Sequence, residues 1–148
     1  MNKHVNLKNA RKEDQIAIMR QIIEDGVCPF CRENLEKYHT KPILFETRHW
    51  VVTENAWPYE LTKKHFLLIS QRHLTHSGQI NEDEWSDISK IFKILEEKYG
   101  LDSGTMLLRF GDMNKTGATV KHVHIQLIQS DPDNPEYDPQ KGLLTRIG

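Results

Sequence analysis

The chain has 148 residues, of which 20 are basic and 21 acidic, so its formal net charge is −1. A chain of this length predicts one domain, which can bury about 70% of its unfolded surface without disulfides. The balanced charge creates no overall field for nucleic acid or an anionic membrane, so we expect neither as a partner.

The segment Met1–Lys12 is polar and basic and has no apolar stretch. It has the character of neither a secretory signal nor a membrane anchor, so we expect a cytoplasmic protein. The two cysteines, Cys28 and Cys31, are separated by two residues. In a reducing compartment this spacing favours a metal or redox site over a structural disulfide.

The first part of the chain predicts a helix followed by a hairpin. Apolar residues share one helical face over about residues 11–25, and Gly26 is a typical left-handed stop. Residues 32–41 are polar and predict a loop. Two runs rich in β-forming residues within 42–53 then predict the hairpin.

The middle of the chain predicts a loop, a strand and a long helix. Residues 55–64 are polar and predict the loop, and the apolar run 65–70 predicts a central strand. Asn81 and Glu84 have the spacing of a capping box, and apolar residues at helical spacing follow as far as Gly100.

The last part predicts two strands joined by a glycine-bearing loop. The strands are expected at residues 105–110 and 121–128, the loop at 111–117 and an irregular tail at 131–148. The order of helix, hairpin, strand, helix and two strands predicts a single α+β domain over residues 1–148. Its antiparallel sheet would be packed by helices.

Polar and branched apolar residues alternate in segment 121–128, which is the period of a half-buried strand. His122, His124 and Gln126 therefore share one face, about 6.6 Å apart in sequence order. They could be ligands along one edge of a metal site, a nucleophile with its supporting residues, or a solvated sheet face. A neutral imidazole attacks phosphorus when its other nitrogen is oriented and nearby donors hold the phosphoryl oxygens. His124 has such neighbours.

The segment Cys28-Pro29-Phe30-Cys31 favours structural zinc over a thioredoxin-like redox motif, because no βαβ pattern surrounds it. A zinc ion needs four ligands, so two more must come from the eight histidines. Spacing alone does not choose among them.

Three ordered motifs resemble the histidine triad superfamily. Residues 116–128 are similar to its signature, with Gln126 in the third triad place. Residues 65–73 resemble its strand that ends in a basic residue and a histidine, and the cysteine pair resembles its zinc-bearing members. The resemblance covers about residues 25–130. It implies an antiparallel meander sheet, a homodimer and nucleotide binding.

The resemblance implies that His124 attacks the α-phosphorus of a nucleotide and becomes transiently nucleotidylated. The backbone carbonyl of His122 would orient its ring. Gln126 would donate to a phosphate oxygen, and Thr119 would bind a phosphate or leaving-group oxygen.

The resemblance also implies where the substrate lies. The backbone around Gly117 and Ala118 would let the phosphate approach closely, and the nucleotide pocket would lie near Asn55 and Trp57. Trp57 either stacks on the base or packs on the core. The family's asparagine before the first motif histidine falls near residues 111–112, where this chain has glycine and aspartate.

In the uridylyltransferases of the superfamily, zinc is held by the cysteine pair, the histidine after the central strand and the first motif histidine. The resemblance therefore implies a structural zinc on Cys28, Cys31, His73 and His122. This metal would brace the strand beside the nucleophile. His65 is either a supporting residue or a surface histidine at a strand start.

Glutamine in the third place resembles the galactose-1-phosphate uridylyltransferases and dinucleoside polyphosphate phosphorylases. An amide cannot shuttle a proton, which favours an acceptor with its own charged oxygen over water. We therefore expect a nucleotidyltransferase or phosphorylase that moves a nucleotidyl, most simply an adenylyl, group through His124. The alternatives are a hydrolase, a nucleotide-binding module with little turnover, and a thiol redox protein.

Overall fold

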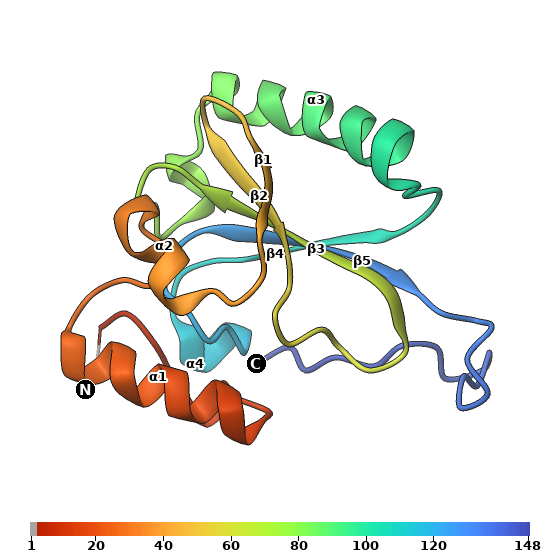
Figure 1. Cartoon of the computed structure of the whole chain (residues 1–148), viewed down its shortest axis with the longest axis horizontal. Coiled ribbons are helices and arrows are strands. Elements are labelled where there is room, and N and C mark those ends of the chain that lie inside the picture. The colour runs from red at the N-terminus through yellow and green to blue at the C-terminus, as the bar shows by residue number, and fades with distance from the viewer. Residues whose placement is uncertain (1–2) are drawn as a thin grey trace.

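The computed structural model describes residues 3–148 (Figure 1). Met1 and Asn2, which begin the predicted polar segment, lie outside the described residues. The antiparallel sheet has the order β1-β2-β3-β5-β4. Its strands are β1 (Ile43–Glu46), β2 (Trp50–Glu54), β3 (Thr62–Ser70), β4 (Thr105–Arg109) and β5 (His124–Ser130). The predicted α+β domain with an antiparallel sheet is confirmed.

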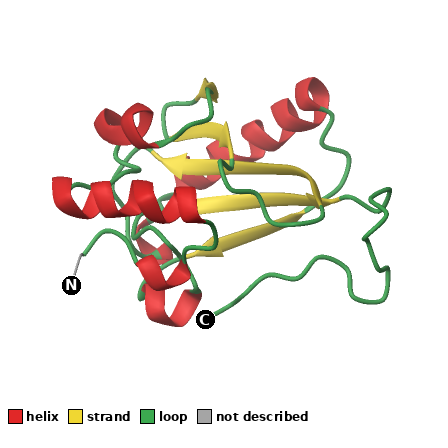
Figure 2. Cartoon of the chain, turned by 60° about the horizontal axis from the view of Figure 1, so that its bottom comes forward, coloured by secondary structure: helices red, strands yellow, loops and turns green. Residues whose placement is uncertain are grey.

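Helices cover both faces of this sheet, as Figures 1 and 2 show. The α-helices are α1 (Glu13–Asp25), α2 (Arg32–Tyr38), α3 (Glu82–Tyr99) and α4 (Met113–Thr116). Two short 3-10 helices are η1 (Leu7–Asn9) and η2 (Ser77–Gln79). The long α3 lies along one side of the sheet, whereas α1 and α2 lie on the other. Among residues 3–148, no helix combines the length and apolar character that a membrane crossing needs.

The larger apolar cluster fills the space between the sheet and α3. It combines alternate residues of β2, β3 and β5, together with Val123 just before β5, with one face of the helix: Trp50, Val52, Phe66, Leu68, Val123, Ile125, Leu127, Ile88, Ile91 and Leu95. The apolar residues of segment 121–128 thus face a core, as their alternation predicts. The polar residues between them face the opposite helical layer.

A capping box fixes the start of α3. The side chain of Asn81 accepts a hydrogen bond from the Glu84 backbone at 2.9 Å, and that of Glu84 accepts one from the Asn81 backbone at 2.8 Å. Arg72 donates to the same buried carboxylate at 2.7 Å and lowers the pKa of Glu84. Gly100 ends the helix in the left-handed conformation, with φ of 64°. The predicted helix and both of its ends are confirmed.

Two smaller apolar clusters lie on the other face of the sheet. One contains Leu35 of α2 with Val51, Leu67 and Ile69 of the sheet. The second joins α1 to the segment before β5 and contains Val5, Met19, Ile22, Tyr38 and Val120. The polar face of β5 therefore lies beneath a helical layer rather than in open solvent.

The predicted loop at residues 32–41 is wrong for its first part, because Arg32–Tyr38 forms α2. Only two of its residues are buried, Leu35 and Tyr38, which are 0% and 6% exposed. A helix of two turns with two apolar residues gives too short a pattern to reveal its period. The stability of α2 comes from packing against the sheet, which its local sequence does not indicate.

Three strand and loop bounds also differ from the prediction. β3 begins at Thr62 rather than at residue 65, because its polar first residues pair with the end of β5. β5 begins at His124, and the backbone before it bonds to irregular segments: Lys121 N to His4 O at 2.8 Å and Val123 N to Leu74 O at 2.7 Å. The expected glycine loop contains the single turn α4, which Asp112 caps.

Candidate functional site

His124, the first residue of β5, is held in one tautomer. Its Nδ1 lies 2.7 Å from the backbone oxygen of His122. A carbonyl oxygen only accepts, so Nδ1 carries the proton and donates it, which leaves the lone pair on Nε2. Burial, followed by the charge of Arg109, lowers the pKa of His124. The ring is therefore neutral at neutral pH and presents a nucleophilic nitrogen.

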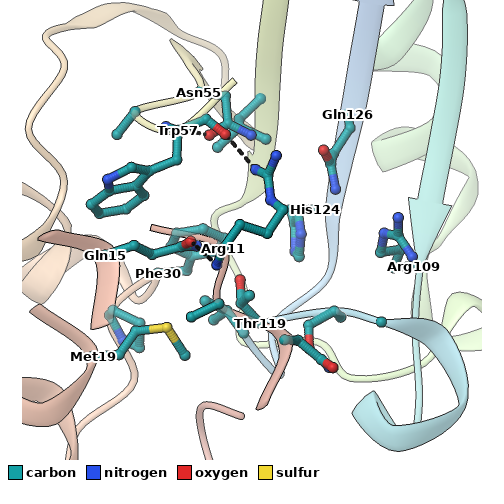
Figure 3. Close-up of a pocket in the computed structure, with 18 of the residues that line it drawn as sticks. Arg11, Gln15, Met19, Phe30, Asn55, Trp57, Arg109, Thr119, His124 and Gln126 are labelled. Carbon is teal, nitrogen blue, oxygen red and sulfur yellow. Dashed lines mark hydrogen bonds between the residues drawn. The ribbon is translucent and has the colours of Figure 1, made fainter. Parts of the chain in front are cut away.

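His124 lines a cavity between the sheet and the N-terminal layer, drawn in Figure 3. Apolar residues of α1 and the cysteine loop form one part of its wall, among them Ile18, Met19, Ile22, Pro29 and Phe30. Four basic side chains also line it: Lys8, Arg11, Arg109 and Arg146. No lining residue from the described part of the chain is acidic. Such a cavity suits a ligand with an apolar ring and a negative charge.

A histidine on the neighbouring strand orients the amide of Gln126. The backbone N–H of Tyr59 donates to Nδ1 of His65 at 3.2 Å, so the ring proton of His65 is on Nε2. This Nε2 lies 2.8 Å from Oε1 of Gln126, which accepts the proton. The amide nitrogen of Gln126 is left to donate into the cavity. Burial lowers the pKa of His65 to about 4, so the ring stays neutral at neutral pH.

The other residues predicted to bind substrate line the same cavity: Asn55, Trp57, Gly117, Ala118 and Thr119. The Asn55 side chain accepts from the Trp57 backbone at 2.8 Å and shapes this loop. Gly117 has φ of 70°, a left-handed conformation that suits glycine. The hydroxyl of Thr119 makes no hydrogen bond with residues 3–148 and is available to a ligand.

Cys28, Cys31, His73 and His122 come together in a separate group beside the cavity. Their ligand atoms all lie within 4.8 Å of one another. The distances between sulfur and Nδ1 are 3.4 Å for Cys28 and His122, 3.3 Å for Cys31 and His73, and 3.9 Å for Cys31 and His122. Tetrahedral zinc with ordinary bond lengths separates sulfur from nitrogen by about 3.6 Å. The group fits that ion.

The protonation of these residues also fits a cation. Nε2 of His122 lies 2.7 Å from the Ser70 backbone oxygen, to which it donates, so the lone pair of Nδ1 points at the two sulfurs. Burial raises the pKa of Cys28, and burial together with Cys28 raises that of Cys31 to about 12. A bound divalent cation reverses this preference and stabilises both thiolates.

Much of the cavity wall was not anticipated from the sequence, including Arg11, Phe30, Tyr59 and Arg109. The guanidinium of Arg11 lies over the Tyr59 ring, 4.5 Å from its centroid, and the Phe30 ring meets that of His124 edge-on at 5.2 Å between centroids. Of these four, Arg109 alone left a signal in the sequence, because it is the single charged residue of its strand and follows three apolar residues. The others lie on loops whose packing no local pattern reveals.

Comparison with known proteins agrees with this architecture. The model of a family described as "Protein similar to CwfJ C-terminal" matches residues 16–136. No protein of curated function matches the chain in sequence.

Many solved structures share the fold. A histidine triad nucleotide-binding protein from Candida albicans is 21% identical, with a TM-score of 0.54 over 88% of this chain and 82% of that one. A diadenosine triphosphate hydrolase from Plasmodium falciparum is 22% identical, with a TM-score of 0.51 over 62% of this chain and 63% of that one. A zinc-bound histidine triad family protein from Mycobacterium smegmatis is 13% identical, with a TM-score of 0.51 over 77% and 78%. At these identities the likeness concerns the fold.

Proposed function

Because this chain belongs to the family of proteins similar to the CwfJ C-terminal region and has the histidine triad fold, we propose that it transfers a nucleotidyl group through His124. The observation that carries this proposal is the neutral ring of His124, whose Nδ1 donates to the His122 carbonyl at 2.7 Å while Nε2 has no hydrogen-bond partner among residues 3–148. It stands in a cavity with four basic residues and, within residues 3–148, no acidic one.

The proposed reaction has two displacements at the α-phosphorus. The lone pair of His124 Nε2 forms a P–N bond while the bond to the leaving phosphate breaks, and the leaving oxygen takes that electron pair. The ring proton stays on Nδ1, where the His122 carbonyl stabilises the positive charge. An acceptor oxygen then attacks phosphorus, and the P–N bond breaks to restore the neutral ring.

Gln126 and Thr119 are proposed to hold the phosphoryl oxygens during both steps. The amide nitrogen of Gln126 faces the cavity because its oxygen accepts from His65 at 2.8 Å. Donors fixed before the reaction lower the barrier without reorganisation. Asn55 and Trp57, with the backbone at Gly117 and Ala118, are proposed to form the rest of the substrate site.

Glutamine at this place supports a transferase or phosphorylase rather than a hydrolase. An amide neither gains nor loses a proton near neutral pH, so it cannot act as a general base toward water as an imidazole does. An acceptor such as inorganic phosphate brings its own charged oxygen. We therefore propose the branch of galactose-1-phosphate uridylyltransferases and dinucleoside polyphosphate phosphorylases, with adenylyl as the transferred group. The fold shared with a diadenosine triphosphate hydrolase keeps hydrolysis as the second candidate.

Zinc is proposed as the ion of the Cys28, Cys31, His73 and His122 group, where it would hold the strand beside the nucleophile. This ion would not take part in the reaction.

A second copy of the chain is proposed as the partner. The exposed edge strand β4 supports this, because Met106 on it is 45% exposed.

The test uses a dinucleoside tetraphosphate and a nucleotide labelled with 32P at the α-position. We expect the label to remain on the denatured protein and to be absent from His124→Asn. With inorganic phosphate, a phosphorylase releases nucleoside diphosphate that does not form in its absence. Monophosphate formed regardless of phosphate would show that water is the acceptor and would support the hydrolase. Binding without any label or turnover would leave only a nucleotide-binding module.

A further inference from the structure

Arg109 is a buried arginine in the cavity wall, and it has no acidic partner in the described part of the chain. The residue is 6% exposed, and it is paired with His124 in the register of β4 and β5. No carboxylate of residues 3–148 lies within salt-bridge distance of its guanidinium. Buried charges are ordinarily paired, so an unpaired one beside a cavity indicates an anionic ligand.

The guanidinium of Arg109 donates instead to neutral acceptors. One nitrogen donates to the Thr116 backbone oxygen, and the other to the Tyr59 hydroxyl at 3.2 Å and the Arg146 backbone oxygen at 2.8 Å. It also lies 3.5 Å from the hydroxyl of Thr145. Charge-assisted bonds to phosphate are about twice as strong as those to neutral oxygens, so a phosphate can replace these acceptors.

The acceptors from the last residues of the chain are weakly anchored. Residues 143–148 form no helix or strand. Of their three large apolar residues, Leu144 and Ile147 are 76% and 74% exposed, and Leu143 is partly buried. Little apolar burial opposes a movement of this segment away from Arg109.

We propose that Arg109 binds the phosphate group that leaves when His124 attacks the nucleotide, an inference that rests on the proposed nucleotidyl transfer. Figure 3 shows Arg109 on the other side of His124 from Trp57 and Met19. A nucleotide with its base against the apolar wall would extend its phosphates past His124 toward Arg109. As the P–O bond breaks, the guanidinium compensates the charge gained by the leaving oxygen, and no proton is transferred.

The test measures binding of adenosine, AMP, ADP and ATP by calorimetry, with His124→Asn in every protein to prevent turnover. In the parent protein we expect affinity to rise with each phosphate beyond the first. Arg109→Met lowers the affinity for ADP and ATP by about tenfold to a hundredfold, the range of a charge-assisted contact. Adenosine binds within about threefold of the parent, and Arg109→Lys recovers part of the loss.

Two further arginines serve as comparisons. Arg20 is exposed on α1 and does not line the cavity, so Arg20→Met is expected to bind all four ligands as the parent does. Arg11 lines the cavity on the side of Trp57. If Arg11→Met lost the preference for ADP and ATP while Arg109→Met kept it, the role proposed for Arg109 would be wrong.

The outcomes separate this inference from the proposed function. Equal losses for adenosine and ATP in Arg109→Met would reduce Arg109 to a structural residue while leaving nucleotidyl transfer intact. A parent that binds none of the four ligands would contradict both. Thermal melting checks that each variant is folded. If Arg109→Met does not fold, the same binding measurements are made on Arg109→Gln, which keeps hydrogen-bond donors without the charge.

Discussion

His65 donates a hydrogen bond from Nε2 to Oε1 of Gln126 at 2.8 Å, and thereby determines which end of the amide faces the cavity. The tautomer of His65 is determined by the backbone N–H of Tyr59, which donates a hydrogen bond to Nδ1, the other ring nitrogen. A backbone donor cannot reverse its polarity, so the tautomer of His65 and the orientation of Gln126 are set by the fold.

His65→Leu is expected to lower kcat by about tenfold, because the Gln126 amide can then rotate its oxygen toward the phosphoryl group. KM should change little, since the cavity keeps its basic residues. His65→Gln restores a donor and should recover part of kcat. Steady-state kinetics of the proposed transfer measure both values, and an unchanged kcat in His65→Leu would contradict a role in orienting Gln126.

Gln126→His is expected to shift the acceptor from phosphate toward water. An imidazole at this place can take up and release a proton as a general base near neutral pH, which the amide cannot do. Product analysis in the presence of inorganic phosphate should show a ratio of nucleoside monophosphate to diphosphate at least severalfold above that of the wild type. Gln126→Ala is the control, because it removes the donor without adding a base and should slow both products alike.

Removal of the metal is expected to destabilise the protein. Elemental analysis should find one zinc per chain, and Cys31→Ser should lose it together with several kcal/mol of stability, as for other structural zinc sites. His49→Ala, which changes a histidine outside the group, should keep both. Reversible formation of a Cys28–Cys31 disulfide without bound metal would instead support the thiol redox alternative.

Acidification is expected to destabilise the fold through His65. The pKa of this ring is lowered by burial to about 4, whereas the unfolded value is about 6.5. The unfolded chain therefore binds more protons, and the contribution of neutral His65, present in full above about pH 6.5, is lost as the pH falls toward 4. Over that range the difference is on the order of 3 kcal/mol.

Urea denaturation of the wild type and His65→Gln at several pH values measures this contribution. The two proteins share the metal group, so the pH dependence of metal binding cancels in the comparison. The wild type should lose more stability than His65→Gln between pH 6.5 and 5. Parallel curves would show that His65 titrates alike in the folded and unfolded chains.

The sequence predicted the parts of the fold whose signals are local and repeated. The capping box of Asn81 and Glu84, the long apolar period of α3 and the alternation along β5 all correspond to the structure. It missed α2, because Leu35 and Tyr38 provide its only buried side chains, and these pack on distant strands and on α1, respectively.

The residues of the candidate site likewise divide into those that local sequence patterns predicted and those that they did not. His124 and Gln126 stand at fixed spacing on one strand, so their common face could be foreseen, whereas the grouping of Cys31 with His73 came only from family resemblance. Arg109 could have been noticed as a charge within an apolar strand. Arg11 could not, because its place over the Tyr59 ring depends on how the N-terminal segment crosses the sheet.

The metal group joins two parts of the molecule that have separate apolar clusters. Cys28 and Cys31 follow α1, whose cluster is small, while His73 and His122 adjoin the strands of the large one. If the proposed zinc binds there, its loss would leave the sheet and α3 with their own core but would remove one of the links that hold α1 over the cavity. Zinc supply in the cell would then set the number of molecules with a complete cavity, and leave the rate of each complete molecule unchanged.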